Sequence, residues 1–410
     1  MSRHDIFECM SVLALLLGCL AIQAGDAPAL PKVTEEELQR IERVPSAVFP
    51  WKKVAPAAPK KTANPAAPDD AVMDLNSGEI IIKAVGNFSR EERSGKEILT
   101  LTKDVEIEQL TTQSVLRGQT IRVVRDLKTG QTELLEAQGG VEVVTAERKG
   151  RGELLTYETQ YGPQGQLIKD MYTIEGDFRK GVRAILWQGD DVIEAEKFVN
   201  DRRLDTFRVS GGPIAIMTIP GDPRQAPPKT QGTAGGMLPG LGVSPGGKIR
   251  LKADGEMFYE GSSGRVRITR NVILQQDPTA TDPGMRITSD EALLTLLLPP
   301  PGQPAGTSVF SGSLKSMECT GRVEIKTATQ TVLCDHAVLD MQKKNFVMEM
   351  KVAKDEVRVY LTDKKMALIA PKSLTVNMET SEFHSAGSLR MESFSGTPPS
   401  NRTPVLPKAK

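Results

Sequence analysis

The chain has 410 residues, of which 39% are hydrophobic and only 4% are aromatic. Lysine plus arginine and aspartate plus glutamate both number 52, so the formal net charge is zero. This length is enough for two or three domains, and the balanced charge argues against a nucleic-acid partner, because such partners select for an excess of basic residues.

The N-terminal segment has the pattern of an export signal. A basic residue precedes an apolar run over residues 10–22, and the Ala-Gly dipeptide at 24–25 is a suitable cleavage site. The run is too short to cross a bilayer, which predicts a signal peptide over residues 1–24. Two alternatives stay open: a lipoprotein lipidated at Cys19, and a retained anchor. All three place the folded part outside the cytoplasm.

Residues 25–71 are predicted to form a short helix followed by a tether. Thr34-Glu35-Glu36-Glu37 is a capping-box pattern, which favours a helix start. From residue 45 to residue 70 the chain carries six prolines among alanines and lysines. This composition predicts an extended, solvated segment without a packed core.

Two strand-rich blocks follow, and neither has helical periodicity of useful length. We expect an all-β protein with two elongated β-jelly-roll modules. The predicted boundaries are a first module at 72–219, a Pro/Gly-rich linker at 220–247, a second module at 248–391 and a flexible tail at 392–410.

A pair of short strands recurs five times along the two blocks. The first strand opens on a Val-x-apolar pattern, and the second is built around one small residue. The five openers contain Val105, Val141, Val272, Val323 and Val357, and the small residues are Gly118, Gly152, Ser289, Cys334 and Ala370. Recurrence of this kind predicts a repeated architecture.

The alternating strands each point two aliphatic side chains to one face. These candidate lipid-groove residues are Val105, Ile107, Val141, Val143, Val266, Ile268, Val323, Ile325, Val357 and Val359. Two interpretations stay open: the side chains fill an ordinary sandwich core, or they line a groove between two splayed sheets. Few aromatic residues favour acyl chains over sugars in such a groove, and each buried methylene is worth about 0.8 kcal/mol.

Two cysteines remain after the predicted cleavage, and we expect both to be buried thiols. A hairpin centred near Ala328 places Cys319 opposite Ala337, which does not suit a disulfide to Cys334. Cys334 and His336 are two residues apart, which predicts a shared strand face. With Cys319 they would make an incomplete zinc site, because no fourth ligand is evident.

Enzyme motifs are weak. Gly242-x4-Gly247-Lys248 resembles a phosphate loop, but Ile249 stands where Ser or Thr should hold magnesium. Acidic pairs such as Asp190-Asp191 have no second carboxylate at catalytic distance. We therefore expect no enzyme activity, no cofactor and no metal.

Three stretches resemble a known family. Gly140-Val141-Glu142-Val143, followed by Gly152-x-x-Leu155-x-Tyr157, is similar to the OstA-like units of the LptA-type lipopolysaccharide-transport family. The stretches at 251–272 and 321–337 resemble the same unit. The resemblance covers residues 72–391, apart from the linker, and this chain departs from the small bridge proteins in having two blocks where they have one.

The resemblance implies a periplasmic, non-enzymatic lipid carrier or bridge that holds the acyl chains of lipopolysaccharide, or of another lipid, in an apolar groove. It assigns Val105, Ile107, Val141, Val143, Val323 and Ile325 to that groove. It also implies that edge strands join the chain to other jelly-roll transport proteins, or to copies of itself end to end. The alternative is a structural or adhesive β-solenoid that binds proteins or cell wall.

Overall fold

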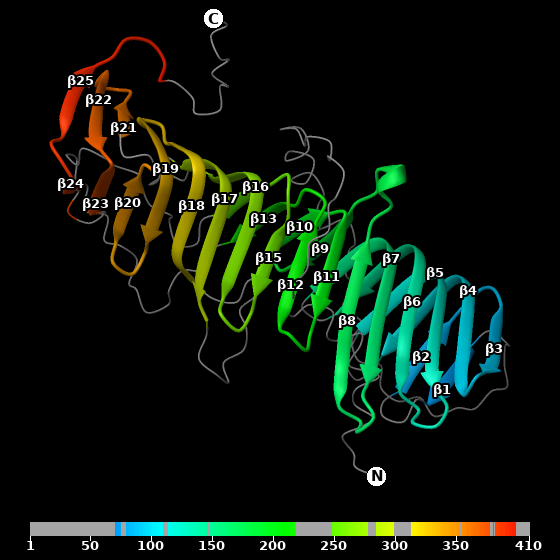
Figure 1. Cartoon of the computed structure of the whole chain (residues 1–410). Helices are drawn as coiled ribbons and strands as arrows, with labels where there is room; N and C mark the ends of the chain where they lie inside the picture. Colours follow the sequence, from blue (N-terminus) through cyan, green and yellow to red (C-terminus); the bar gives the residue numbers. More distant parts are fainter. Residues whose placement is uncertain are drawn as a thin grey trace, which may run out of the picture. The chain divides into compact units, whose positions relative to one another are not determined.

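A computed structural model describes residues 70–74, 79–109, 114–145, 148–218, 248–277, 284–298, 313–351, 355–377, 380 and 382–398. The predicted signal peptide, the N-terminal helix, almost all of the tether, the linker and the end of the tail lie outside these residues. The helices and strands of the described residues are all strands, apart from one 3-10 helix, η1 (Phe178–Lys180), and every strand pair is antiparallel (Figure 1). The all-β prediction is confirmed. No helix in the described ranges has the length and apolar character of a membrane span.

The described residues divide into two compact units, which meet along the chain at Asp205 and Thr206. This division precedes the predicted end of the first module at residue 219. The strands of the first unit are β1 (Asp70–Asp74), β2 (Glu79–Lys83), β3 (Phe88–Arg93), β4 (Lys96–Gln109), β5 (Ser114–Asp126), β6 (Thr132–Val144), β7 (Arg148–Tyr161), β8 (Leu167–Glu175), β9 (Ala184–Gln188), β10 (Asp191–Ala195) and β11 (Lys197–Asp201).

The second unit starts with two strands that the sequence assigned to the first module. They pair with β15 and β14 of the second unit. The strands of this unit are β12 (Thr206–Ser210), β13 (Ile214–Thr218), β14 (Lys248–Lys252), β15 (Met257–Glu260), β16 (Arg265–Gln276), β17 (Met285–Leu297), β18 (Ser313–Lys326), β19 (Gln330–Asp340), β20 (Asn345–Glu349), β21 (Glu356–Leu361), β22 (Met366–Pro371), β23 (Ser373–Asn377), β24 (Phe383–Ser385) and β25 (Arg390–Ser393).

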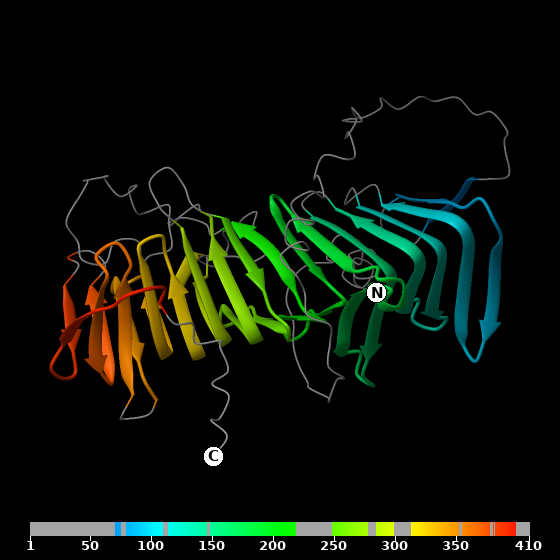
Figure 2. The same ribbon diagram turned by 90° about the horizontal axis from the view of Figure 1, so that it is seen from above.

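The long strands of the first unit bend once in the middle (Figure 2). β4 shifts register between Thr102 and Val105, where Lys103 and Asp104 have φ of 67° and 52°. β6 bends in the same way at two glycines, with φ of 82° and 60°. The sequence predicted separate strands beginning at these points. Each is instead the second half of one continuous strand, because two left-handed residues redirect the chain without ending its pairing.

The bends divide the first unit into two layers. We call one of them layer A. It contains the whole of β3, β8 and β11, together with the first halves of β4 and β6 and the second halves of β5 and β7. Layer B consists of β1, β2, the other halves of β4 to β7, β9 and β10. The layers face each other: a Cβ added to Gly150 of layer B would lie 2.9 Å from Cδ1 of Ile174 in layer A.

The second unit repeats this plan with β16 to β19 as its bent strands. The bends fall between Thr269 and Val272 in β16 and between Thr320 and Val323 in β18. Layer A here consists of β12, β15, one half of each bent strand, β20, β23 and β24. Layer B consists of β13, β14, the other halves, β21, β22 and β25.

In four of the five repeats the recurring strand pair of the sequence corresponds to this bend, whereas β21 and β22, the fifth pair, are joined without a register shift. In all five repeats the opener valine lies directly opposite the small residue of the next strand: Val105 and Gly118, Val141 and Gly152, Val272 and Ser289, Val323 and Cys334, and Val357 and Ala370. The small residue is needed where the layers converge. A Cβ on Gly152 would lie 2.7 Å from the carbonyl oxygen of Glu175 in β8.

Candidate functional site

The interior between the two layers is the candidate site. In the first unit, Val105, Ile107, Val141 and Val143 lie on the inner face of layer B, and none is more than 8% exposed. The pairing of β4, β5 and β6 aligns Ile107 and Val143 on either side of Leu116. The four predicted residues of this unit therefore belong to one aliphatic surface.

The predicted residues of the second unit are divided between its layers. Val323, Ile325, Val357 and Val359 lie in layer B, where Val332 separates Ile325 from Val359 in the register. The pair Val266 and Ile268 precedes the bend of β16 and lies in layer A. All six are buried.

In the first unit, sequence reasoning missed the opposite wall of the interior. In β4 and β6 the openers follow the bend and lie in layer B. The residues that line layer A precede the bend in β4 and β6 and follow it in β5 and β7. In the first unit one cross-strand row of layer A contains Leu101, Ile121, Ala137, Leu155, Ile174 and Phe198, all buried. The available signal was the apolar alternation that precedes the bend, as in Leu99-x-Leu101.

A second inner row of layer A in the first unit ends in polar side chains. The rings of Tyr157 and Tyr172 stack with centroids 4.2 Å apart. Burial raises the pKa of Tyr172 well above its ordinary value of 10.0, so its phenol is neutral at physiological pH. Beside it, Asp170 pairs with Arg202 at 3.0 Å. The interior is therefore aliphatic at its β4 side and amphipathic at its β8 side.

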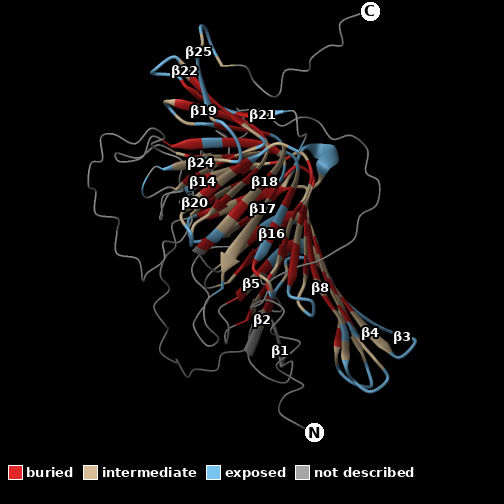
Figure 3. Cartoon of the chain, turned by 60° about the vertical axis from the view of Figure 1, so that its left-hand side comes forward, coloured by how far each residue is buried: buried red, intermediate tan, exposed pale blue. Residues whose placement is uncertain are grey.

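The interior is closed to solvent at every predicted position. Side chains from both layers cover the ten candidate residues, of which Ile107 has the highest exposed fraction, 8%. In the described residues this matches the sandwich-core interpretation of the sequence (Figure 3). An acyl chain could enter only if the layers moved apart.

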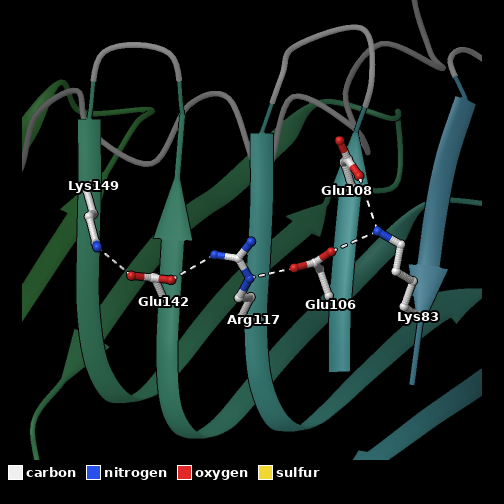
Figure 4. A network of polar contacts seen from close by, with 6 residues as sticks. All are labelled: Lys83, Glu106, Glu108, Arg117, Glu142 and Lys149. Atoms are coloured by element: carbon white, nitrogen blue, oxygen red, sulfur yellow. Dashed lines mark hydrogen bonds and ion pairs between the residues drawn. The ribbon is translucent and has the colours of Figure 1, made fainter. Parts of the chain in front are cut away.

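Ion pairs cross five strands, β2, β4, β5, β6 and β7, on the outer face of layer B in the first unit (Figure 4). Glu106 accepts from Lys83 at 3.0 Å and from Arg117 at 2.6 Å. Glu142 pairs with Arg117 at 2.9 Å and with Lys149 at 2.5 Å. Lys83, Glu106, Arg117 and Glu142 are direct cross-strand neighbours. The glutamate of each Val-Glu-aliphatic opener thus faces outward between two inward aliphatic residues.

These contacts change the proton affinities of both carboxylates. Partial burial alone would raise the pKa of Glu106 and of Glu142, but the hydrogen bonds and charges of their basic partners outweigh it, and both pKa values fall below 4.5. Both glutamates are therefore ionised at neutral pH. We name Lys83, Glu106, Arg117, Glu142 and Lys149 the charge row.

The predicted positions of the two cysteines are confirmed. Cys319 lies opposite Ala337 in the β18–β19 pairing, and both cysteines are buried free thiols. Burial raises the pKa of Cys319 and of Cys334 to about 12. A thiol with so high a pKa is a poor nucleophile and a poor metal ligand at neutral pH.

The prediction that Cys334 and His336 share a face is wrong, because β19 bends between them. His336 lies on the outer face, with Nε2 2.9 Å from Glu318 and Nδ1 3.1 Å from Glu349. The two carboxylates contact opposite nitrogens of one ring, so the three groups do not converge on one point. Among the described residues, no group of three or more His, Cys, Asp or Glu side chains could hold a metal ion.

The glycines of the sequence that resembles a phosphate loop, at 242 and 247, lie outside the described residues. The residues that follow them, Lys248 and Ile249, begin strand β14. No protein-family model matches the chain, and no curated protein matches it either.

Proposed function

We propose that this protein is a non-enzymatic lipid carrier that holds acyl chains between layers A and B. The observation that carries the proposal is the aliphatic lining that both layers contribute in each unit, with the charged side chains of the openers outside. The likeness of residues 140–157 to lipopolysaccharide-transport units supports lipopolysaccharide as the cargo and the periplasm as the location.

The bends determine where such an interior would open. The bent strands join the layers covalently along one side of each unit, so the layers would part at the opposite side, where the hairpin turns lie. A chain of twelve carbons would gain roughly 10 kcal/mol on leaving water. That gain would offset the contacts between layers that are lost on opening.

Partners would add to the edge strands. In the described part of the chain β3 pairs only with β4, and β25 pairs only with β22. Every residue of β3 and of β25 is exposed. Such edges suit strand addition by another jelly-roll transport protein or by a second copy of this chain.

The test is photo-crosslinking in cells from positions 141 and 323, each carrying a photoreactive residue. Adducts with lipid are expected at both positions because both side chains point inward. A photoreactive residue at Glu142 is the matched control, because it is the next residue of the same strand and points outward. Absence of lipid adducts at 141 and 323, or equal adducts at 142, would contradict the proposal.

A structural or adhesive β protein is the second candidate. The closed interior favours it, since none of the ten predicted groove residues is more than 8% exposed. A structural protein would copurify without lipid, and a dye that fluoresces in apolar pockets would give no signal with it. Mass spectrometry of lipids extracted from the purified protein distinguishes the two functions.

A further inference from the structure

The first unit has a hollow of about 820 Å³ on the outer face of layer A, away from the interior. It lies at the ends of two hairpins, β5–β6 and β7–β8. Both hairpins are irregular here: Glu133 is an extra residue in the pairing of β6 with β5, and Ile168 is an extra residue in the pairing of β8 with β7. Extra residues of this kind bend hairpin ends, which accounts for a concave region on an otherwise regular sheet.

The floor of the hollow is aliphatic. Val124 and Leu134 are direct cross-strand partners and line it. Val124 faces outward but is only 7% exposed. Tyr161, Gln131 and Gln160 add one aromatic ring and two amides to the lining.

The charged residues of the lining are paired, with one exception. Lys96 pairs with Glu133, and Lys169 with Glu158. Asp126 accepts hydrogen bonds from the backbone of the adjoining turn at 128–129. Within the described part of the chain, Arg122 lines the hollow without a carboxylate partner.

We propose that this hollow binds an anionic saccharide, a hexose unit that carries a phosphate or carboxylate group. The planar guanidinium of Arg122 would bind the anionic group through two hydrogen bonds. The carboxylates of Glu133 and Glu158 and the two amides supply acceptors and donors for sugar hydroxyls. The floor and Tyr161 supply apolar surface for the C–H face of the ring. The volume lies within the range of small-molecule sites.

The hollow and the interior are on opposite faces of layer A, so this inference does not depend on lipid carriage. The same chemistry fits a free sugar phosphate and the headgroup of a phosphorylated glycolipid. The sequence alone gives no sign of this site, because its residues come from five strands and only the pairing of β4 to β8 brings them together.

The test is titration of the full chain with glucose 1-phosphate, followed by calorimetry and by NMR of the valine and leucine methyl groups. Saturable binding is expected, with shifts at Val124 and Leu134 and with glucose at least tenfold weaker. Arg122→Gln should weaken binding of glucose 1-phosphate about tenfold or more, because a charged hydrogen-bonding partner is lost. Arg151→Gln, at an exposed arginine of β7 outside the hollow, should leave it unchanged.

A second variant, Leu134→Asp, places a negative charge in the floor and should abolish binding of glucose 1-phosphate. Circular dichroism identifies variants that fail to fold. No saturable binding by the wild type, equal binding of glucose, or full binding by folded Arg122→Gln would overturn the proposal. Phosphatidylglucoside in micelles identifies the source: tighter binding than the free sugar phosphate assigns the site to a lipid headgroup, and equal binding assigns it to the free sugar.

Discussion

At the bends, close packing limits the size of the side chain. A Cβ added to Gly152 would lie 2.7 Å from both the backbone oxygen of Glu175 and Cγ2 of Ile174, closer than real Cβ contacts allow. At Gly118 the nearest atom, the carbonyl oxygen of Gln138, is 3.2 Å away. The two positions occupy equivalent places in the repeat but differ in how closely the next backbone approaches.

We therefore expect Gly152→Ala to lower the free energy of unfolding by about 1–3 kcal/mol, because β8 must move or the bend must open. Gly118→Ala is the matched control and should cost less, since its contact is only slightly tight. Urea denaturation measures both. Equal losses in the two variants would show that the close approach of β8 does not set the requirement for glycine.

The buried thiols give a second prediction at this scale. Because burial raises the pKa of Cys319 and Cys334 to about 12, almost no thiolate exists at pH 8. We expect a thiol reagent such as Ellman's to leave both unmodified in the folded protein and to react with both in denaturant. Rapid reaction of the native protein, or loss of both thiols to a disulfide under non-reducing conditions, would contradict this account.

Single residues were predictable from the sequence where local alternation is intact. The inward positions of Val141 and Val143 and the register of Cys319 with Ala337 follow from strand period and hairpin length. Face assignment failed across a bend: Cys334 points inward and His336 outward, although a straight strand would place them together. The alternation of apolar and polar residues does not reveal a bend in the backbone when the bend is formed by residues other than glycine or proline.

At the scale of strands, the bends were missed because two of the four that are made by a pair of left-handed residues, those of β4 and β16, contain no glycine. In β6 the bend is Gly139-Gly140, a recognisable signal, but in β4 it is Lys103-Asp104 with φ of 67° and 52°. Side chains support the strained residues: Gln119 Nε2 donates to Asp104 Oδ1 at 2.7 Å. That bond depends on the pairing of β4 with β5, which the sequence of β4 alone does not contain.

The charge row predicts an acid dependence of stability. The pKa values of Glu106 and Glu142 are lower in the folded chain than their ordinary value of 4.5, so folding favours their ionised forms. Their contribution to stability is therefore fully present well above pH 4.5 and is lost as the pH falls through the lowered values. We expect the urea midpoint to fall between about pH 5 and pH 3.

Glu142→Gln should weaken that acid dependence, because the variant has no carboxylate to protonate at this position. Glu91→Gln, at an exposed glutamate of β3 with no ion pair among the described contacts, should keep the wild-type dependence. Salt should reduce the difference between wild type and Glu142→Gln at neutral pH, since the partners are partly solvated. An unchanged profile in Glu142→Gln would show that the charge row does not couple to folding.

At the scale of the whole chain, two units share one topology but differ on their outer faces. The outer row of layer B that passes through Glu106, Arg117 and Glu142 in the first unit is ionic. Its counterpart in the second unit runs through Glu324, Leu333, Arg358 and Ile369. Leu333 and Ile369 are buried there, in an outer cluster with Tyr360 and Ala367.

The chain after β25 covers this outer cluster. Phe394 packs against it, with its ring 5.2 Å from that of Tyr360 in an edge-to-face arrangement. Its backbone nitrogen donates to the carbonyl of Lys365 at 3.0 Å. From their sequence, residues 392–410 are predicted to form a flexible tail. The contact of Phe394 could not be predicted, because one aromatic residue in a polar segment has no periodicity.

Phe394→Ala should therefore uncover apolar surface on the second unit. We expect a loss of about 2 kcal/mol in the free energy of unfolding, below the value for a fully buried phenylalanine because Phe394 is only partly buried. Binding of an apolar dye to the folded protein should increase. Phe88→Ala is the matched control: Phe88 is 50% exposed at the start of β3, so its removal should change stability by less than about 0.5 kcal/mol. Equal behaviour of the two variants would mean that Phe394 lies on the cluster without stabilising it, and that layer B of the second unit tolerates an open apolar face.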